Sequence, residues 1–309
     1  MWRDTDPRDD ERERPDLSRG STARADDSAS KSEESRDALT RDLDLPRGPT
    51  RRPVRDRDRT INLRESEVRM LATAGAFRVV VASDLRDQRG RPAGAGNGEL
   101  RGLREAGLVE TRPYVIGRDR ATLVTLTDRG RDLLERHRRT DREGVPQTYY
   151  AGFVKPRELS HDAQLYRAYE RSAERLKEKG AMVTRVVLDY ELKRDYQRFL
   201  HDLKRERRGQ EQGQDAERHA ADVAEWAASR DLPVIDGHLH FPDVRIGYER
   251  PDGERKVEDI EVVTPHYRGA YAAAKGRTGF SSYRISTGLG GRGGRSGRTP
   301  NPRIFEEFL

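Results

Sequence analysis

The chain has 309 residues, of which 33% are hydrophobic and 38% are charged. This composition is too polar for the whole length to be packed, so part of it is expected to be disordered. The absence of cysteine excludes disulfides, zinc knuckles and thiol catalysis. No apolar run approaches the roughly 20 residues that cross a bilayer, and no signal-peptide pattern is present. These features predict a cytoplasmic protein with no membrane partner, and the net charge of +6 is compatible with nucleic-acid binding.

Residues 1–60 predict a disordered, charged arm. They mix Arg, Asp, Glu, Ser and Pro with almost no aliphatic periodicity, and order is expected to begin at Ile61. Acids and bases are interspersed, which favours a solvated tail over a DNA-binding arm. The one basic cluster lies at 51–55 and reads Arg-Arg-Pro-Val-Arg.

Residues 61–139 predict three helices, a hairpin and a fourth helix. The helices are expected over 62–75, with Asn62 as its cap, and over 80–85 and 97–107. Alternating segments at 108–112 and 121–126 predict the hairpin, and Thr127 and Asp128 are expected to cap the last helix.

This order, with Leu-Arg-Glu-Ala-Gly-Leu-Val at 103–109 and Leu-Thr-Asp-Arg-Gly at 126–130, resembles winged helix-turn-helix regulators of the MarR type. The resemblance implies DNA binding. Arg101 and Arg104 on the third helix would enter a major groove, while Arg118 and Arg120 on the wing would hold phosphates. Such modules also serve as protein-interaction or dimerisation units.

After a linker over 140–157, the pattern predicts a helix at about 161–179 and a strand at 181–190. A charged helical insertion follows over 195–230. His161 lies at the start of the first of these helices. It is a candidate for metal or phosphate binding, and a cap of the first helical turn is the alternative.

The stretch 241–263 predicts a hairpin turning at 250–254, with its apolar side chains on one face. If pairing is symmetric about residue 252, paired residue numbers sum to 504 and Asp243 faces Glu261. Like charges so placed are destabilising unless a cation lies between them. Mg²⁺ or Mn²⁺ is the expected cation, because hard ions take carboxylate and phosphate oxygens. The alternative is a surface hairpin with solvated acids.

Pro242-Asp243 followed by Glu261 resembles the PD-(D/E)XK nuclease core in the form found in replication-relaxation proteins, a family that includes plasmid-mobilisation relaxases. The resemblance implies a restriction-endonuclease-like mixed sheet flanked by helices over 158–287, with Glu170 and Glu191 as further candidate acids. Val263 stands where the lysine of the motif belongs. A helix expected over 265–275 would bring Lys275 to that place.

The sequence therefore predicts an α+β protein that nicks or processes DNA in plasmid replication or mobilisation, alongside other proteins of that process. Asp243 and Glu261 would bind the metal, and Lys275 would stabilise charge on the phosphate. Tyr267 or Tyr271 is the alternative nucleophile to water. The alternatives to an enzyme are a winged-helix regulator or accessory factor on a decayed nuclease fold, which Val263 favours, and a partner-binding adaptor. The Gly/Arg-rich tail over 288–309 is expected to be disordered, and the oligomeric state stays open.

Overall fold

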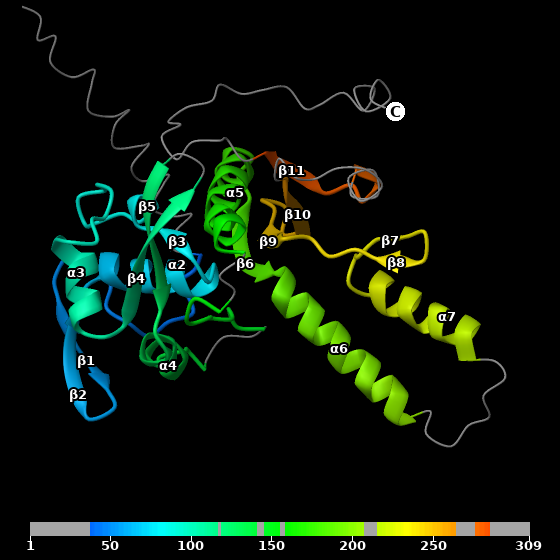
Figure 1. Ribbon diagram of the computed structural model, residues 1–309, viewed down its shortest axis with the longest axis horizontal. Helices are drawn as coiled ribbons and strands as arrows, with labels where there is room; N and C mark the ends of the chain where they lie inside the picture. Colours follow the sequence, from blue (N-terminus) through cyan, green and yellow to red (C-terminus); the bar gives the residue numbers. More distant parts are fainter. Residues whose placement is uncertain are drawn as a thin grey trace, which may run out of the picture.

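The computed structural model describes residues 38–116, 119–140, 145–154, 158–206, 215–263 and 276–284. The architecture is mixed α+β, with helix α5 (Leu159–Glu178) between a first part and a four-stranded sheet (Figure 1). One continuous hydrophobic core contains residues of both parts, including Tyr149. The stretch over 140–157, expected as a linker, therefore contributes to the core itself.

The first part is a hairpin, three α-helices and a small sheet. Its strands and helices are β1 (Arg52–Asp56), β2 (Arg59–Leu63), α2 (Glu65–Ala76), β3 (Val80–Val81), the 3-10 helix η1 (Ala82–Asp84), α3 (Gly98–Glu105), β4 (Val109–Ile116), β5 (Asp119–Leu126) and α4 (Asp128–Arg136). β1 pairs with β2, and the other three strands form an antiparallel sheet in the order β3-β5-β4. The expected hairpin and last helix are confirmed.

Order begins earlier than residue 61, so the expected arm over 1–60 is wrong for residues 38–60, and residues 1–37 lie outside the described residues. Leu39 and Leu43 are 2% exposed, and Val54 of β1 is 5% exposed. Apolar side chains that are sparse in a charged sequence can still be buried when distant elements cover them. Asn62 lies in β2 rather than capping α2, where the carboxylate of Glu67 accepts from the Arg64 backbone N–H at 3.1 Å.

The helix expected over 80–85 is also wrong. Val80 and Val81 form β3 and pair with Val124 and Leu123 of β5, after which the chain makes the single turn of η1. β-Branched side chains have few allowed rotamers in a helix and pack well on a strand, which explains the outcome.

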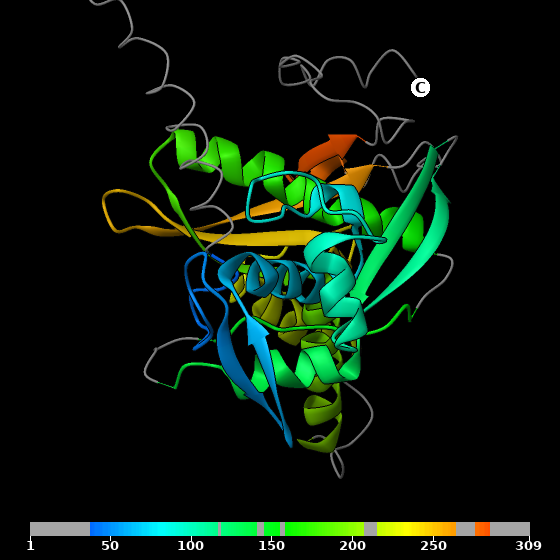
Figure 2. The same cartoon turned by 90° about the vertical axis from the view of Figure 1, so that its left-hand side faces the viewer.

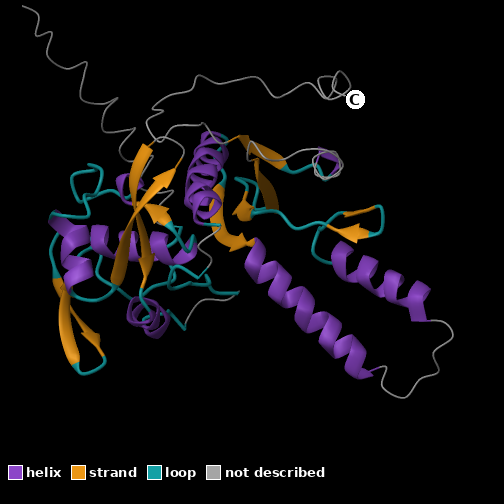
Figure 3. Cartoon of the chain, viewed as in Figure 1, coloured by secondary structure: helices purple, strands orange, loops and turns teal. Residues whose placement is uncertain are grey.

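The second part is the sheet with its covering helices. Its further elements are β6 (Met182–Leu188), α6 (Asp189–Glu206), α7 (Asp215–Ala228), β7 (Val234–Ile235), β8 (His238–Leu239), β9 (Val244–Glu249), β10 (Arg255–Val263) and β11 (Ser281–Arg284). The strand order is β11-β10-β9-β6, with β11 parallel to β10 and the other pairs antiparallel. α5 runs alongside the β9–β10 hairpin (Figure 2). α6 and α7 form an arm that points away from the rest (Figure 3).

The β9–β10 hairpin has the register expected from sequence. Every pair from Arg255 with Glu249 to Ile260 with Val244 has residue numbers that sum to 504. Val244, Ile246, Ile260 and Val262 are at most 1% exposed and belong to the main core. On the opposite face, Arg245 forms a bidentate ion pair with Asp259, with both N–O distances 2.7 Å.

β6 is an edge strand of this sheet. On its outer edge, side chains form hydrogen bonds with its backbone groups. The amide of Gln147 donates to the carbonyl of Val186 at 2.9 Å and accepts from its N–H at 3.1 Å. Arg41 donates to the carbonyl of Thr184 at 2.6 Å. Buried backbone groups need such partners, because leaving them unpaired costs free energy.

α4 begins as predicted and lies very close to the chain just before β4. The hydroxyl of Thr127 accepts from the Gly130 N–H at 3.1 Å, which caps the helix. A Cβ added at Gly130 would lie 2.0 Å from the carbonyl oxygen of Leu108. Only glycine therefore fits at this position.

Gly130→Ala is expected to lower the free energy of unfolding by about 2–3 kcal/mol, because backbone must move to admit the methyl group. Gly102→Ala is the matched control, since Gly102 lies in α3 and nothing is within 4 Å of its added Cβ. That change should be neutral or stabilise by up to about 1 kcal/mol. Urea denaturation of both variants checks the pair, and equal stabilities would contradict this packing.

Candidate functional site

Asp243 lies where β9 begins and where its ladder with β10 ends. Pro242 precedes it and has no N–H to continue the ladder. The Asp243 N–H donates to the carbonyl of Ile260 at 3.0 Å, and its Oδ2 accepts from the N–H of Val262 at 2.7 Å. These two contacts lie on either side of Glu261, which is 3% exposed. The main chain of Asp243 therefore lies next to that of Glu261 at one end of the hairpin.

His161, in the first turn of α5, contacts Asp243 from the neighbouring layer. Its Nε2 lies 3.3 Å from Oδ2 of Asp243, and its Nδ1 lies 3.7 Å from Oδ1 of Asp162. Burial alone would lower the pKa of His161, but the two carboxylates outweigh burial and raise the pKa to about 10. His161 is therefore protonated at neutral pH, and it balances the charge of Asp243.

Arg78 extends this group of charges into the first part of the protein. Its Nη2 lies 3.5 Å from Oδ2 of Asp162, and both residues are buried. With His161 protonated, the set of Arg78, His161, Asp162 and Asp243 has two positive and two negative charges. Such neutrality matters because an unpaired buried charge costs several kcal/mol.

Of the other residues predicted for the nuclease site, three are not described by the structure and two pair with other side chains. Lys275, Tyr267 and Tyr271 lie outside the described residues. Glu170 accepts a hydrogen bond from the Tyr166 hydroxyl at 2.6 Å, and Glu191 is buried against Arg185. Both candidate acids thus have side-chain partners of their own, Tyr166 for Glu170 and Arg185 for Glu191.

The predicted DNA-contacting arginines are exposed where they are described. Arg101 and Arg104 lie on the exposed face of α3, and Arg101 pairs with Glu105 at 2.7 Å. Arg120 is exposed on β5. Arg118 lies outside the described residues.

Sequence reasoning missed Arg78 and the tyrosines beside it. The guanidinium of Arg78 lies 5.6 Å from the ring centre of Tyr190, which packs edge-on against Tyr150 at 5.9 Å. The Tyr150 hydroxyl has no hydrogen-bond partner among the described residues, and burial raises its pKa. The sequence did contain a signal, because Arg78 is the single charged residue in the apolar run 74–82. A charge within such a run is expected to be buried and therefore to have an acidic partner.

Asp243 and Glu261 offer oxygen ligands, which suit Mg²⁺ or Mn²⁺. Within the described ranges no group of three or more His, Asp or Glu side chains is arranged to hold a metal ion.

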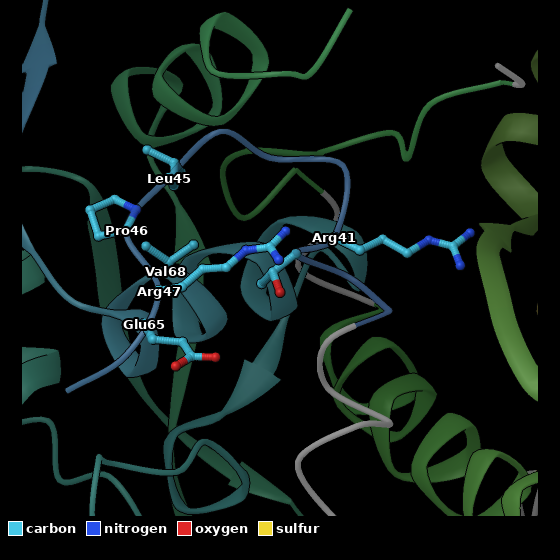
Figure 4. A pocket seen from close by; sticks show the side chains of 7 residues that line it. Arg41, Leu45, Pro46, Arg47, Glu65 and Val68 are labelled. Atoms are coloured by element: carbon cyan, nitrogen blue, oxygen red, sulfur yellow. The ribbon is translucent and has the colours of Figure 1, made fainter. Parts of the chain in front are cut away.

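A small cavity of about 130 Å³ lies elsewhere, between the segment 40–47 and α2 (Figure 4). Glu65, on its wall, accepts from the Gly48 N–H at 2.6 Å and pairs with Arg69. In Figure 4 Arg41 points away from the other labelled side chains, consistent with its bond to β6. None of the residues around Asp243 lines this cavity.

Comparisons with protein-family models, with curated proteins and with solved structures found no match to this chain. In the part of the chain that the structure describes, no helix has the length and apolar character needed to cross a membrane.

Removing either partner of the Arg78–Asp162 pair should strand a buried charge. We expect Arg78→Met and Asp162→Asn each to lower the free energy of unfolding by about 3–5 kcal/mol. The double variant should lose less than the sum, with a coupling of about 1–3 kcal/mol. The surface pair of exposed Arg175 with partly buried Glu258 is the control, for which a cycle of the same design should give about 0–1 kcal/mol. Additive losses at Arg78 and Asp162 would contradict the pairing.

The raised pKa of His161 predicts a dependence of stability on pH. The folded state binds this proton more tightly than the unfolded chain, in which histidine titrates near 6.5. The stabilisation is complete below about pH 6.5 and is lost as the pH rises to about 10, by up to about 1.4 kcal/mol per pH unit.

His161→Gln should remove the fall in the free energy of unfolding between about pH 6.5 and pH 10, measured by urea denaturation at several pH values. His201→Gln, at an exposed histidine of α6, should keep the wild-type slope. The same slope in wild type and His161→Gln would show that His161 is not held protonated.

Proposed function

We propose that this protein is a metal-dependent DNA endonuclease that nicks or processes DNA in replication or mobilisation of a plasmid. The observation that carries the proposal is the position of Asp243, whose main chain and carboxylate contact the residues on both sides of Glu261. Two carboxylates at the end of one hairpin, approached by a histidine from a helix, form a site suited to phosphodiester chemistry.

The order of elements supports this proposal. α5 precedes β6, and the β9–β10 hairpin follows, which is the helix, strand and paired-acid arrangement that the resemblance to replication-relaxation proteins implies. In the first part, α2, β3, α3, the β4–β5 hairpin and α4 follow one another in an order compatible with a winged helix. On this proposal, that part selects the DNA site and Arg101 and Arg104 enter a groove.

Asp243 and Glu261 would hold the ion, which when bound supplies charge stabilisation at the phosphate and a lower pKa of an attacking water. The chain's own contribution is geometric. Val262 fixes one oxygen of Asp243 through its N–H, and the core positions of Val244 and Ile260 hold the strand end in place. Lys275 would complete the charge stabilisation.

One observation favours a second function, a non-enzymatic DNA-binding regulator. Val263 replaces the usual lysine, and Oδ2 of Asp243 already accepts from Val262 and contacts His161. A decayed nuclease site filled by structural partners would have these properties.

The test is nicking of supercoiled plasmid from the host element by wild type, Asp243→Asn and Glu261→Gln, with Mg²⁺, Mn²⁺ or EDTA. We expect metal-dependent nicking by the wild type and a loss of at least about 100-fold in both variants, since each removes a negative charge that would hold the metal ion. Asp252→Asn is the control, because Asp252 lies on the same hairpin at the exposed turn.

Retained DNA binding with no nicking in any metal would support the regulator instead. Equal nicking by wild type and Asp243→Asn would assign the activity to other residues. A protein–DNA adduct that survives denaturation would indicate a tyrosine nucleophile in place of water.

A further inference from the structure

A groove of about 450 Å³ lies between β1, the segment 43–47 and the residues that follow α4. Most of its charged side chains are basic. Its basic members are Arg47, Arg52, Arg55, His137 and Arg139, and its one acid is Asp44. It lies in the first part of the protein and shares no residue with the surroundings of Asp243 or with α3.

Three of these arginines have no internal role. Arg47, Arg52 and Arg55 are exposed, and their side chains have no hydrogen bond or ion pair in the described structure. This contrasts with other arginines nearby, since Arg51 pairs with Glu67 and Arg57 pairs with Asp132. An exposed, unpaired guanidinium keeps its planar set of donors available for phosphate oxygens.

The walls of the groove are fixed to the body. Asp56 of β1 is 1% exposed and accepts from Nε of Arg129 in α4 at 2.6 Å. Nε2 of His137 donates to the carbonyl of Arg55 at 2.9 Å. On the other wall, the Asp44 N–H donates to the carbonyl of His137 at 2.7 Å. The arginines are thus carried on a rigid support, which lowers the entropic cost of binding.

We propose that this groove binds the sugar–phosphate backbone of DNA. This inference rests on the proposed function only in taking DNA as the partner. It does not depend on Asp243 or Glu261. Phosphate oxygens are the acceptors that several unpaired guanidiniums fit best. A continuous backbone also suits a groove whose arginines are spread along β1 and the facing segment. The basic cluster at 51–55, which in the sequence looked like part of a solvated tail, is one wall of this surface.

The experiment measures binding of wild type to a fluorescent duplex in EDTA, over a range of salt concentrations, and compares Arg52→Ala/Arg55→Ala. We expect roughly tenfold weaker binding at low salt and a slope of log affinity against log salt lower by about 2, because each arginine neutralises about one phosphate. Arg171→Ala/Arg255→Ala removes the same charge from exposed positions on α5 and β10 and is the matched control. The control should keep the wild-type affinity and slope.

Equal losses of DNA affinity in the two double variants would show that only net charge matters, and would overturn the proposal that the groove binds DNA. Unchanged binding in Arg52→Ala/Arg55→Ala would overturn it as well. Thermal stabilisation by inorganic phosphate that disappears in this variant, with DNA binding unchanged, would assign the groove to a free phosphate. Groove-dependent DNA binding without nicking would leave this proposal standing and refute the endonuclease. Arg101→Ala/Arg104→Ala measures the contribution of α3 separately.

Discussion

The contact of Phe77 with two tyrosines of α5 holds the two parts of this protein together. Phe77 follows the last residue of α2 and is fully buried, and its ring centre lies 5.2 Å from that of Tyr166 and 5.0 Å from that of Tyr169. Aromatic pairs of this geometry contribute about 0.5–1.5 kcal/mol each beyond the area they bury. They fix the long axis of α5 between the two sheets, and this in turn places the first turn of α5 against the start of β9.

The position that follows Phe77 shows what this arrangement demands of the backbone. Arg78 has φ of 63°, a left-handed conformation that costs a non-glycine residue about 1 kcal/mol or more. The strain is offset by the ion pair with buried Asp162 and the contact with Tyr190. The polar group around Asp243 therefore depends on a residue of the first part as much as on the sheet that carries the acids.

Local patterns predicted the fold well where the partners are close in sequence. The turn at 250–254 predicted the register of β9 and β10, and the apolar pattern over 161–179 predicted the helix α5, because both signals depend only on neighbouring residues. Local patterns could not predict that residues 38–60 are folded rather than disordered. Leu39 and Arg41 are anchored by Tyr149 and by Thr184 of β6, and such distant partners leave no periodic trace in the sequence. The candidate site divides similarly, since Asp243 and Glu261 follow from a hairpin register, whereas the Arg78–Asp162 pair joins elements that only the tertiary structure brings together.

The side chains that form hydrogen bonds with the edge of β6 restrict where a stable fragment of this chain can begin. An uncovered strand at the end of a sheet offers its N–H and C=O groups to any other strand, including one from another copy. Arg41 and Gln147 occupy these groups on β6, and both lie outside the segment that composition alone would take for the sheet domain. A fragment that begins at residue 158 would keep every strand of the sheet and lose the residues that prevent its association.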